Sequence, residues 1–146
     1  MKLRLLSTGV FDLFHIGHLR YLQYARQQGT HLTVAVTPDA LCAERKGKWP
    51  IIHEAQRLEI IRGLGWVDEA RYMPSSLELT DVAAAWITEW GIDHVVVGGD
   101  WEGTPRWQRL IPALAERDIT VGFASHTRDI SSTEIVRRIM SRKSVA

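Results

Sequence analysis

The sequence has little cysteine and no long hydrophobic run. Cys42 is the only cysteine, which excludes an internal disulfide and a zinc site built from thiolates, and a reducing compartment suits such a chain. No apolar stretch approaches the roughly 18 to 20 residues that a membrane-spanning helix requires. The residues after Met1 also lack the pattern of a secretory signal peptide. We therefore expect a cytoplasmic protein without membrane contact.

The sequence also lacks an excess of charge of either sign. Lys and Arg number 18 and Asp and Glu 17, for a net charge of +1. Nucleic-acid-binding proteins of this size are usually more basic, so we expect no nucleic-acid partner. With 146 residues, of which 45% are hydrophobic, the chain can build one core, and we expect a single domain over residues 1–146.

Short apolar segments alternate with helical patterns along the chain. Strands are predicted at residues 3–8, 31–36, 67–73, 94–99 and 120–124, and helices from about 19 to 29 and at 53–64, 80–90, 106–116 and 130–140. Residues 43–50, AERKGKWP, are predicted to form a basic loop. The strands are continuous apolar runs, which favours a Rossmann-like, doubly wound α/β fold with a parallel sheet covered on both faces. Ligands bind at the carboxyl ends of the strands in such folds.

The first strand is followed by an unusual turn, GVFDLFHIGH at residues 9–18. Gly9 and Gly17 are expected to let the backbone approach a ligand closely, at a helix N-terminus that suits phosphate. His15 and His18 are three residues apart and can therefore lie on one side of the first helical turn, as donors to a phosphoryl group. Alternatively one histidine caps the helix and the other is solvated. A zinc site that includes Asp12 lacks further ligands at suitable spacing.

Four motifs resemble those of the nucleotidyltransferase superfamily, in particular the small cytidylyltransferases that act on glycerol 3-phosphate. GVFDLFHIGH resembles G-x-F-D-x-x-H-x-G-H. VDEA (67–70), GGDWEG (98–103) and HTRDISSTEI (126–135) are similar to V-D-E-V, G-D-D-W-E-G and R-T-x-G-I-S-T-T-x-I. The motifs occur in the family's order, and the resemblance covers nearly the whole chain.

The resemblance implies the reaction and its partners. A phosphate oxygen of the acceptor attacks the α-phosphorus of a nucleoside triphosphate, and pyrophosphate leaves without a covalent enzyme intermediate. CMP would pass from CTP to a small phosphorylated alcohol resembling glycerol 3-phosphate. The cofactor would be Mg²⁺, held mainly by the triphosphate and water rather than by a protein site. Homodimers are implied as well.

The resemblance also implies the site residues. The catalytic residues would be His15, His18 and Lys46. The nucleotide would be bound by Thr8, Gly9, Phe11, Lys48, Asp100, Thr127, Ile130, Ser132 and Thr133. For the acceptor the candidates are Arg57 and Trp101, together with Arg62, His126 and Arg128 at positions where the sequence departs from the family.

Several of these residues have a simpler interpretation. The two lysines would suit an ordinary solvated loop, and Arg57 could form a surface salt bridge with Glu54. Trp101 could pack in the core. Residues Ser131 to Glu134 form an S-x-x-E capping box, which is compatible with an anion site at the same helix start.

The sequence departs from the family pattern at positions that concern the acceptor. Gly65 stands where glycerol-phosphate enzymes carry an arginine, and Arg62, one turn earlier, is a candidate replacement. His126 stands at another arginine position, with Arg128 two residues later. Asp129 replaces a glycine, so a positive φ there would cost more.

Two alternative functions stay open. The stretch KGKWPIIHEAQR (46–57), with VDEA and GGD, also resembles the ATP-dependent nucleotidyltransferase module of heptose-phosphate enzymes. The alternative to CTP is therefore an adenylyltransferase that acts on a sugar phosphate, although DWEG and ISST favour CTP. From a different class, the chain could be a non-catalytic nucleotide sensor. The two histidines, the basic loop and the Ser/Thr-rich helix start argue against a sensor.

Overall fold

The computed structural model describes residues 2–142, and within them strands and helices alternate. In chain order the elements are β1 (Arg4–Gly9), α1 (Ile16–Gln27), β2 (His31–Val36), α2 (Asp39–Lys46), α3 (Glu54–Arg62), β3 (Glu69–Tyr72), α4 (Thr80–Glu89), β4 (His94–Gly98), the 3₁₀ turn η1 (Gly99–Trp101), α5 (Pro105–Ala115), β5 (Thr120–Ala124) and α6 (Ser132–Ser141).

The five strands form one parallel sheet in the order β3-β2-β1-β4-β5. The chain moves from β1 outward to β3, returns to β4 on the other side of β1, and then moves outward again to β5. The strand order therefore reverses at β1. This confirms the predicted Rossmann-like, doubly wound fold, and it places the binding crevice outside the carboxyl ends of β1 and its neighbours.

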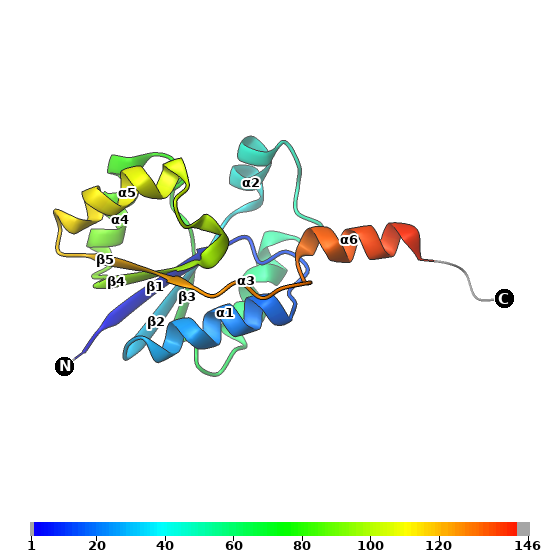
Figure 1. Ribbon diagram of the computed structural model, residues 1–146, viewed down its shortest axis with the longest axis horizontal. Coiled ribbons are helices and arrows are strands. Elements are labelled where there is room, and N and C mark those ends of the chain that lie inside the picture. Colours follow the sequence, from blue (N-terminus) through cyan, green and yellow to red (C-terminus); the bar gives the residue numbers. More distant parts are fainter. Residues whose placement is uncertain (1, 143–146) are drawn as a thin grey trace.

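Helices cover both faces of the sheet (Figure 1). On one face α1 and α3 bury apolar side chains such as Leu22 and Ile61 against Leu5 and Leu32 of the strands. On the other face α4 and α5 pack against Leu6, Ala35, Val95 and Val97. Burial on both faces explains why the strands are continuous apolar runs rather than alternating ones.

The segment predicted as a basic loop is partly helical. Helix α2 runs from Asp39 to Lys46, and only from Gly47 does the chain form a loop. Gly47 has φ 68°, the left-handed conformation that commonly ends a helix. Only Asp39 and Cys42 of α2 are buried, so its apolar pattern is too sparse to predict a helix.

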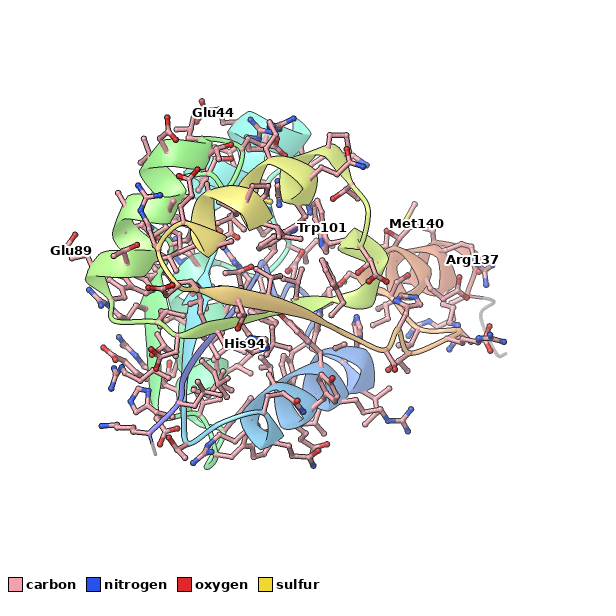
Figure 2. All side chains as sticks on the ribbon, turned by 60° about the vertical axis from the view of Figure 1, so that its left-hand side comes forward. Glu44, Glu89, His94, Trp101, Arg137 and Met140 are labelled. Atoms are coloured by element: carbon pink, nitrogen blue, oxygen red, sulfur yellow. The ribbon has the colours of Figure 1, made fainter. Side chains whose placement is uncertain are left out.

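Helix α6 has no buried residue and extends away from the sheet (Figure 1). Figure 2 shows Arg137 and Met140 on this extended part, and the Met140 side chain is 82% exposed. Within residues 2–142, no helix is both long enough and apolar enough for a bilayer crossing.

Candidate active site

A cavity of about 600 Å³ lies at the carboxyl ends of β1, β2 and β4. It is also bordered by α1, α2, α5 and the start of α6. The structure therefore brings together predicted residues from distant parts of the chain. Those that line the cavity are Thr8, Gly9, Phe11, His18, Lys46, Lys48, Asp100, Trp101, Ser132 and Thr133.

The two histidines cap helix α1 reciprocally. The backbone N–H of Gly17 donates to Nδ1 of His15 at 3.0 Å, and the backbone N–H of His15 donates to Nδ1 of His18 at 3.1 Å. Their rings stack with centroids 3.8 Å apart. Since Nδ1 is an acceptor in both rings, each neutral imidazole carries its proton on Nε2. His18 lines the cavity and can donate from Nε2 to a ligand there, whereas His15 does not line it.

Burial keeps both histidines neutral. It lowers the pKa of His15, and it lowers the pKa of His18 to about 4, with the charge of His15 acting in the same direction and Asp12 opposing it. The rings of Phe11 and Phe14 lie beside His18, with centroids 5.5 and 5.4 Å away. The expected donor to phosphate is therefore a neutral imidazole at neutral pH, not an imidazolium.

The lowered pKa of His18 predicts how stability depends on pH. An unfolded histidine binds a proton below its usual pKa of 6.5, whereas folded His18 resists protonation down to about pH 4. The unfolded state therefore binds more protons in this window, and the free energy of unfolding falls as the pH falls through it. We expect the free energy of unfolding to fall by about 2 kcal/mol between pH 7 and pH 4.5 because of His18 alone. Urea titrations at the two pH values measure this difference.

The control for this pH effect is His18→Asn, which keeps an acceptor at the position of Nδ1 but does not titrate. Between the two pH values the free energy of unfolding of the variant should fall less than that of the wild type, and the difference is the contribution of His18. Equal losses in the two proteins would contradict the assignment. The pKa values of Asp39 and Glu78 are lowered in the folded protein, so these carboxylates add a loss of their own as the pH falls. That loss is common to the wild type and the variant and cancels in the comparison.

The two glycines of the turn serve contacts within the chain. A Cβ on Gly9 would lie 2.9 Å from the ring of Phe11, and one on Gly17 would lie 2.9 Å from the ring of His15. Both glycines are therefore required by these rings, and not by the close approach of a ligand that the sequence suggested. Phe11 and Leu13 have φ of 57° and 51°, values that residues other than glycine rarely adopt. The turn therefore stores backbone strain beside the cavity.

Asp12 holds the loop that carries the lysines. Its two carboxylate oxygens accept the backbone N–H groups of Ile51 and Ile52, each at 2.8 Å. Lys46, the last residue of α2, and Lys48 both line the cavity with exposed side chains. Trp49, 67% exposed, lines it as well. The basic segment thus borders the cavity as predicted, fastened at its far end by Asp12.

The start of α6 is attached to the same turn. The hydroxyl of Ser132 donates to the backbone carbonyl of Asp12 at 2.7 Å, and the hydroxyl of Ser131 accepts the N–H of Glu134 at 3.0 Å. Only this half of the predicted capping box forms, because the Glu134 carboxylate pairs with Arg137 and Arg138 instead. Ser132 and Thr133 therefore present a helix N-terminus to the cavity.

The segment after β4 supplies another side of the cavity. Asp100 and Trp101 lie in η1, where Figure 2 labels Trp101. Both line the cavity, and Trp101 is 36% exposed. The guanidinium carbon of Arg106 lies 4.2 Å from the centroid of the Trp101 ring, a cation–π contact. Trp101 is thus a wall of the cavity rather than a core residue.

The structure contradicts both interpretations of Arg57, binding of the acceptor and a surface salt bridge with Glu54. It is fully buried, and its ion pair is with Asp39 at 2.6 Å, not with Glu54. Its other N–H groups donate to the backbone carbonyls of Val10, Thr37 and Ile52. Because these donors are used within the chain, the guanidinium does not reach an acceptor molecule. It joins three segments around the cavity instead.

The remaining predicted residues lie elsewhere. Arg62 donates to the carbonyl of Ala70 at the start of β3, and Gly65 follows in the loop before that strand. Both are at the amino ends of the strands, because α3 runs opposite to the sheet. The expected contact of Arg62 with an acceptor is therefore wrong for this cavity.

The segment after β5 also faces away from the cavity. His126, Thr127 and Arg128 line a separate hollow with Arg20 and Tyr24 of α1, and not the main cavity. Ile130 is not part of the cavity lining and lies close to Gly17 instead. Asp129 adopts φ 62°, the conformation in which the loss of the family glycine is costly. The predicted contacts of these residues are not made through the main cavity.

Two arginines of the cavity were not predicted from the sequence. Arg45 lines it from α2 and Arg106 from the second position of α5. Arg106 could have been placed near the cavity from Thr104-Pro105, a typical helix start that directly follows the GGDWEG motif. Arg45 lay within the segment interpreted as a loop, so its direction could not be inferred.

A protein-built metal site does not fit the donor set. No group of three or more His, Cys, Asp or Glu residues gathers within residues 2–142 in a way that could hold an ion. Asp12 and Asp100 are the acidic residues in the cavity lining, and both oxygens of Asp12 already accept backbone N–H groups. The described cavity lining therefore offers no pair of free carboxylates to a divalent cation.

Comparison with known proteins supports the resemblance to nucleotidyltransferases over most of the chain, but it does not establish the narrower resemblance to glycerol-phosphate cytidylyltransferases. Residues 6–138 match the family described as "Cytidylyltransferase-like". The chain is 33% identical to the bifunctional protein HldE of Halorhodospira halophila, over 94% of this chain and 28% of that protein. It is 41% identical to the FAD synthase of Thermococcus sibiricus, over 47% of this chain and 46% of that protein.

A solved structure supports the fold. The lipopolysaccharide core biosynthesis protein of Thermoplasma volcanium superposes with a TM-score of 0.68 at 30% identity, covering 87% of this chain and 98% of that one. The match with HldE and that with the FAD synthase of Thermococcus sibiricus each span less than half of the curated relative.

Proposed function

The chain belongs to the cytidylyltransferase-like family of nucleotidyltransferases, and we propose that it transfers AMP from ATP to a small phosphorylated sugar or polyol. Two observations support ATP as the donor. The relatives include FAD synthases, whose product contains an adenine nucleotide, and an HldE protein. The segment KGKWPIIHEAQR also resembles ATP-dependent heptose-phosphate enzymes. CTP is the second candidate, because DWEG and ISST resemble the cytidylyl enzymes.

The observation that carries the proposal is the capped histidine at the cavity. In the proposed reaction an acceptor phosphate oxygen forms a bond to the α-phosphorus, and the bond from that phosphorus to the β-phosphate bridging oxygen breaks. Pyrophosphate leaves with the electron pair. Nε2–H of His18 and the ammonium of Lys46 stabilise the charge that builds up on the phosphoryl oxygens. His15 stacks on His18 and caps α1, so we assign it a positioning role.

The helix N-termini at the cavity bind the triphosphate in this proposal. Gly9 and His18 of the first turn of α1 line the cavity, as do Ser132 and Thr133 at the start of α6. Free N–H groups and the positive end of each helix dipole suit phosphate. Mg²⁺ would be held by triphosphate oxygens and water, and when bound it would neutralise charge on the leaving pyrophosphate.

Pyrophosphate release with each of ATP, CTP, GTP and UTP, against a panel of acceptors, tests the proposal. The acceptors are sugar 1-phosphates, glycerol 3-phosphate, amino-alcohol phosphates and FMN. We expect turnover with ATP and a sugar or polyol phosphate, with a kcat/KM at least about tenfold above that for CTP. Turnover only with CTP would replace ATP by the second candidate.

A non-catalytic sensor gives a different result in the same assay. It would bind a nucleoside triphosphate without releasing pyrophosphate in the presence of any acceptor, and that result would overturn the proposed enzyme. The control is His18→Asn, which should bind the nucleotide but turn over slowly.

The proposal includes a homodimer, as the family resemblance implies. The exposure of Ile139 and Met140 on α6, 60% and 82%, is compatible with a further contact surface. Light scattering coupled to size exclusion decides between 16.6 kDa and twice that mass.

A further inference from the structure

One side of the cavity carries positive charge outside the phosphate-binding elements described above. Arg45 of α2 and Arg106 of α5 line this side, near Leu41, Met73 and Leu77. Arg106 is separate in the chain from the histidine turn, the lysine loop and the start of α6, whereas Arg45 directly precedes Lys46 in α2. Arg57, Arg62 and Arg128, which the sequence singled out for the acceptor, are absent from the cavity lining.

Glu78 holds these arginines together. Its Oε1 accepts from Nε of Arg106 at 2.8 Å and lies 3.3 Å from a terminal nitrogen of Arg45, while its Oε2 accepts from Arg109 at 2.8 Å. Burial acts to raise the pKa of Glu78, but the hydrogen bond from Arg106 and the three nearby positive charges hold it below its usual value. One ionised carboxylate facing three guanidinium groups leaves an excess of positive charge.

Arg106 is fixed on two sides and still has donors to offer. Its Nε is paired with Glu78, its face lies on the ring of Trp101, and its side chain is only 18% exposed. Within residues 2–142, no hydrogen bond uses its two terminal nitrogens, which carry four N–H groups. A guanidinium held in this way is preorganised for two parallel hydrogen bonds to a phosphate or carboxylate.

We propose that Arg106, held by Glu78 and Trp101 and assisted by Arg45, binds an anionic group of the acceptor. This inference rests on the proposed function, because it assigns the second substrate of that reaction to one side of the cavity. The neighbouring Leu41, Met73 and Leu77 are apolar, so the anion would be bound beside an apolar part of the cavity lining. The anion is a phosphate or a carboxylate, and acceptors that carry one or the other distinguish the two.

Arg106→Gln and Arg109→Gln form a matched pair. Both residues lie on α5 and both donate to Glu78, but only Arg106 lines the cavity. In the enzyme assay, Arg106→Gln should raise the KM for the acceptor at least about tenfold and that for the nucleotide less than threefold. Arg109→Gln should change both less than threefold. A raised KM for the nucleotide with an unchanged KM for the acceptor would overturn the inference.

A binding measurement separates this inference from the proposed reaction. Inorganic phosphate is titrated calorimetrically into each protein, with and without saturating α,β-methylene ATP. We expect the affinity for phosphate in the presence of the analogue to fall at least about tenfold in Arg106→Gln and little in Arg109→Gln. Equal affinities in the two variants, or no phosphate binding to the wild type, would overturn the inference. An absence of turnover with any nucleotide, together with the expected phosphate result, would overturn the proposed reaction but leave the anion subsite intact.

Discussion

Replacing His18 with Asn is expected to lower kcat by about 10²- to 10⁴-fold, with a loss of nucleotide affinity below tenfold. The reason is that the two ring nitrogens of His18 have different roles. Nδ1 accepts the N–H of His15 and serves the helix, while Nε2 is the donor left for the cavity. The Oδ1 of Asn can take the place of Nδ1, but Asn has no donor at the position of Nε2. Single-turnover kinetics and nucleotide titrations measure the two effects.

His18→Ala is the companion variant. It removes the cap as well as the donor, so it should match Asn in its low kcat but lose about 1 kcal/mol or more of unfolding free energy in addition. Agreement in kcat with a difference in stability separates the catalytic role from the structural one. A kcat near that of the wild type in His18→Asn would remove His18 from the reaction.

Replacing Arg57 with Met is expected to cost about 3 to 5 kcal/mol of unfolding free energy. The substitution leaves the carboxylate of Asp39 buried without its cation. It also leaves the carbonyls of Val10, Thr37 and Ile52 without their donor. The length of Met fills much of the space, so the loss reports the polar network rather than a cavity. Urea denaturation followed by circular dichroism gives the number.

Arg62→Met is the matched control for that measurement. Arg62 lies in the same helix, is exposed, and donates only to the carbonyl of Ala70, so its replacement should cost less than about 1 kcal/mol. If Arg57→Met does not fold, Arg57→Lys, which retains the charge but has fewer donors, should lose stability by an intermediate amount. Similar losses for Arg57→Met and Arg62→Met would contradict the network.

The strand pattern and the turn after β1 could be predicted because their causes are local. Parallel strands buried on both faces must be apolar throughout, and helix starts after strand ends meet at one edge of the sheet. His18, Ser132 and Thr133 therefore reach the cavity as expected. The dual use of His15 and His18 as caps could be named only as one alternative among several, because the backbone N–H groups that they accept become visible only in the structure.

The errors share a different cause, which is contact between residues far apart in the chain. Arg57 lies in a helix with ordinary polar spacing, and nothing near it in the sequence shows that carbonyls 47 and 20 residues earlier will surround it. Arg106 and Glu78 are similarly 28 residues apart. The motif places His126 and Arg128 directly after β5. Which cavity they face depends on how that segment packs against α1, and the sequence does not show this packing.

The place of β1 in the sheet constrains how the chain can fold during synthesis. Leu5 of β1 pairs with Leu32 of β2, but on its other side with His94 of β4, which follows 89 residues later. The half-sheet of β1, β2 and β3, with α1 and α3, can therefore assemble while one edge of β1 still lacks its neighbour. Such an open edge can recruit strands from other chains, and we expect the long-range pairing with β4 to form later than the pairing with β2. Nascent chains that stall before β4 are therefore the species most exposed to aggregation.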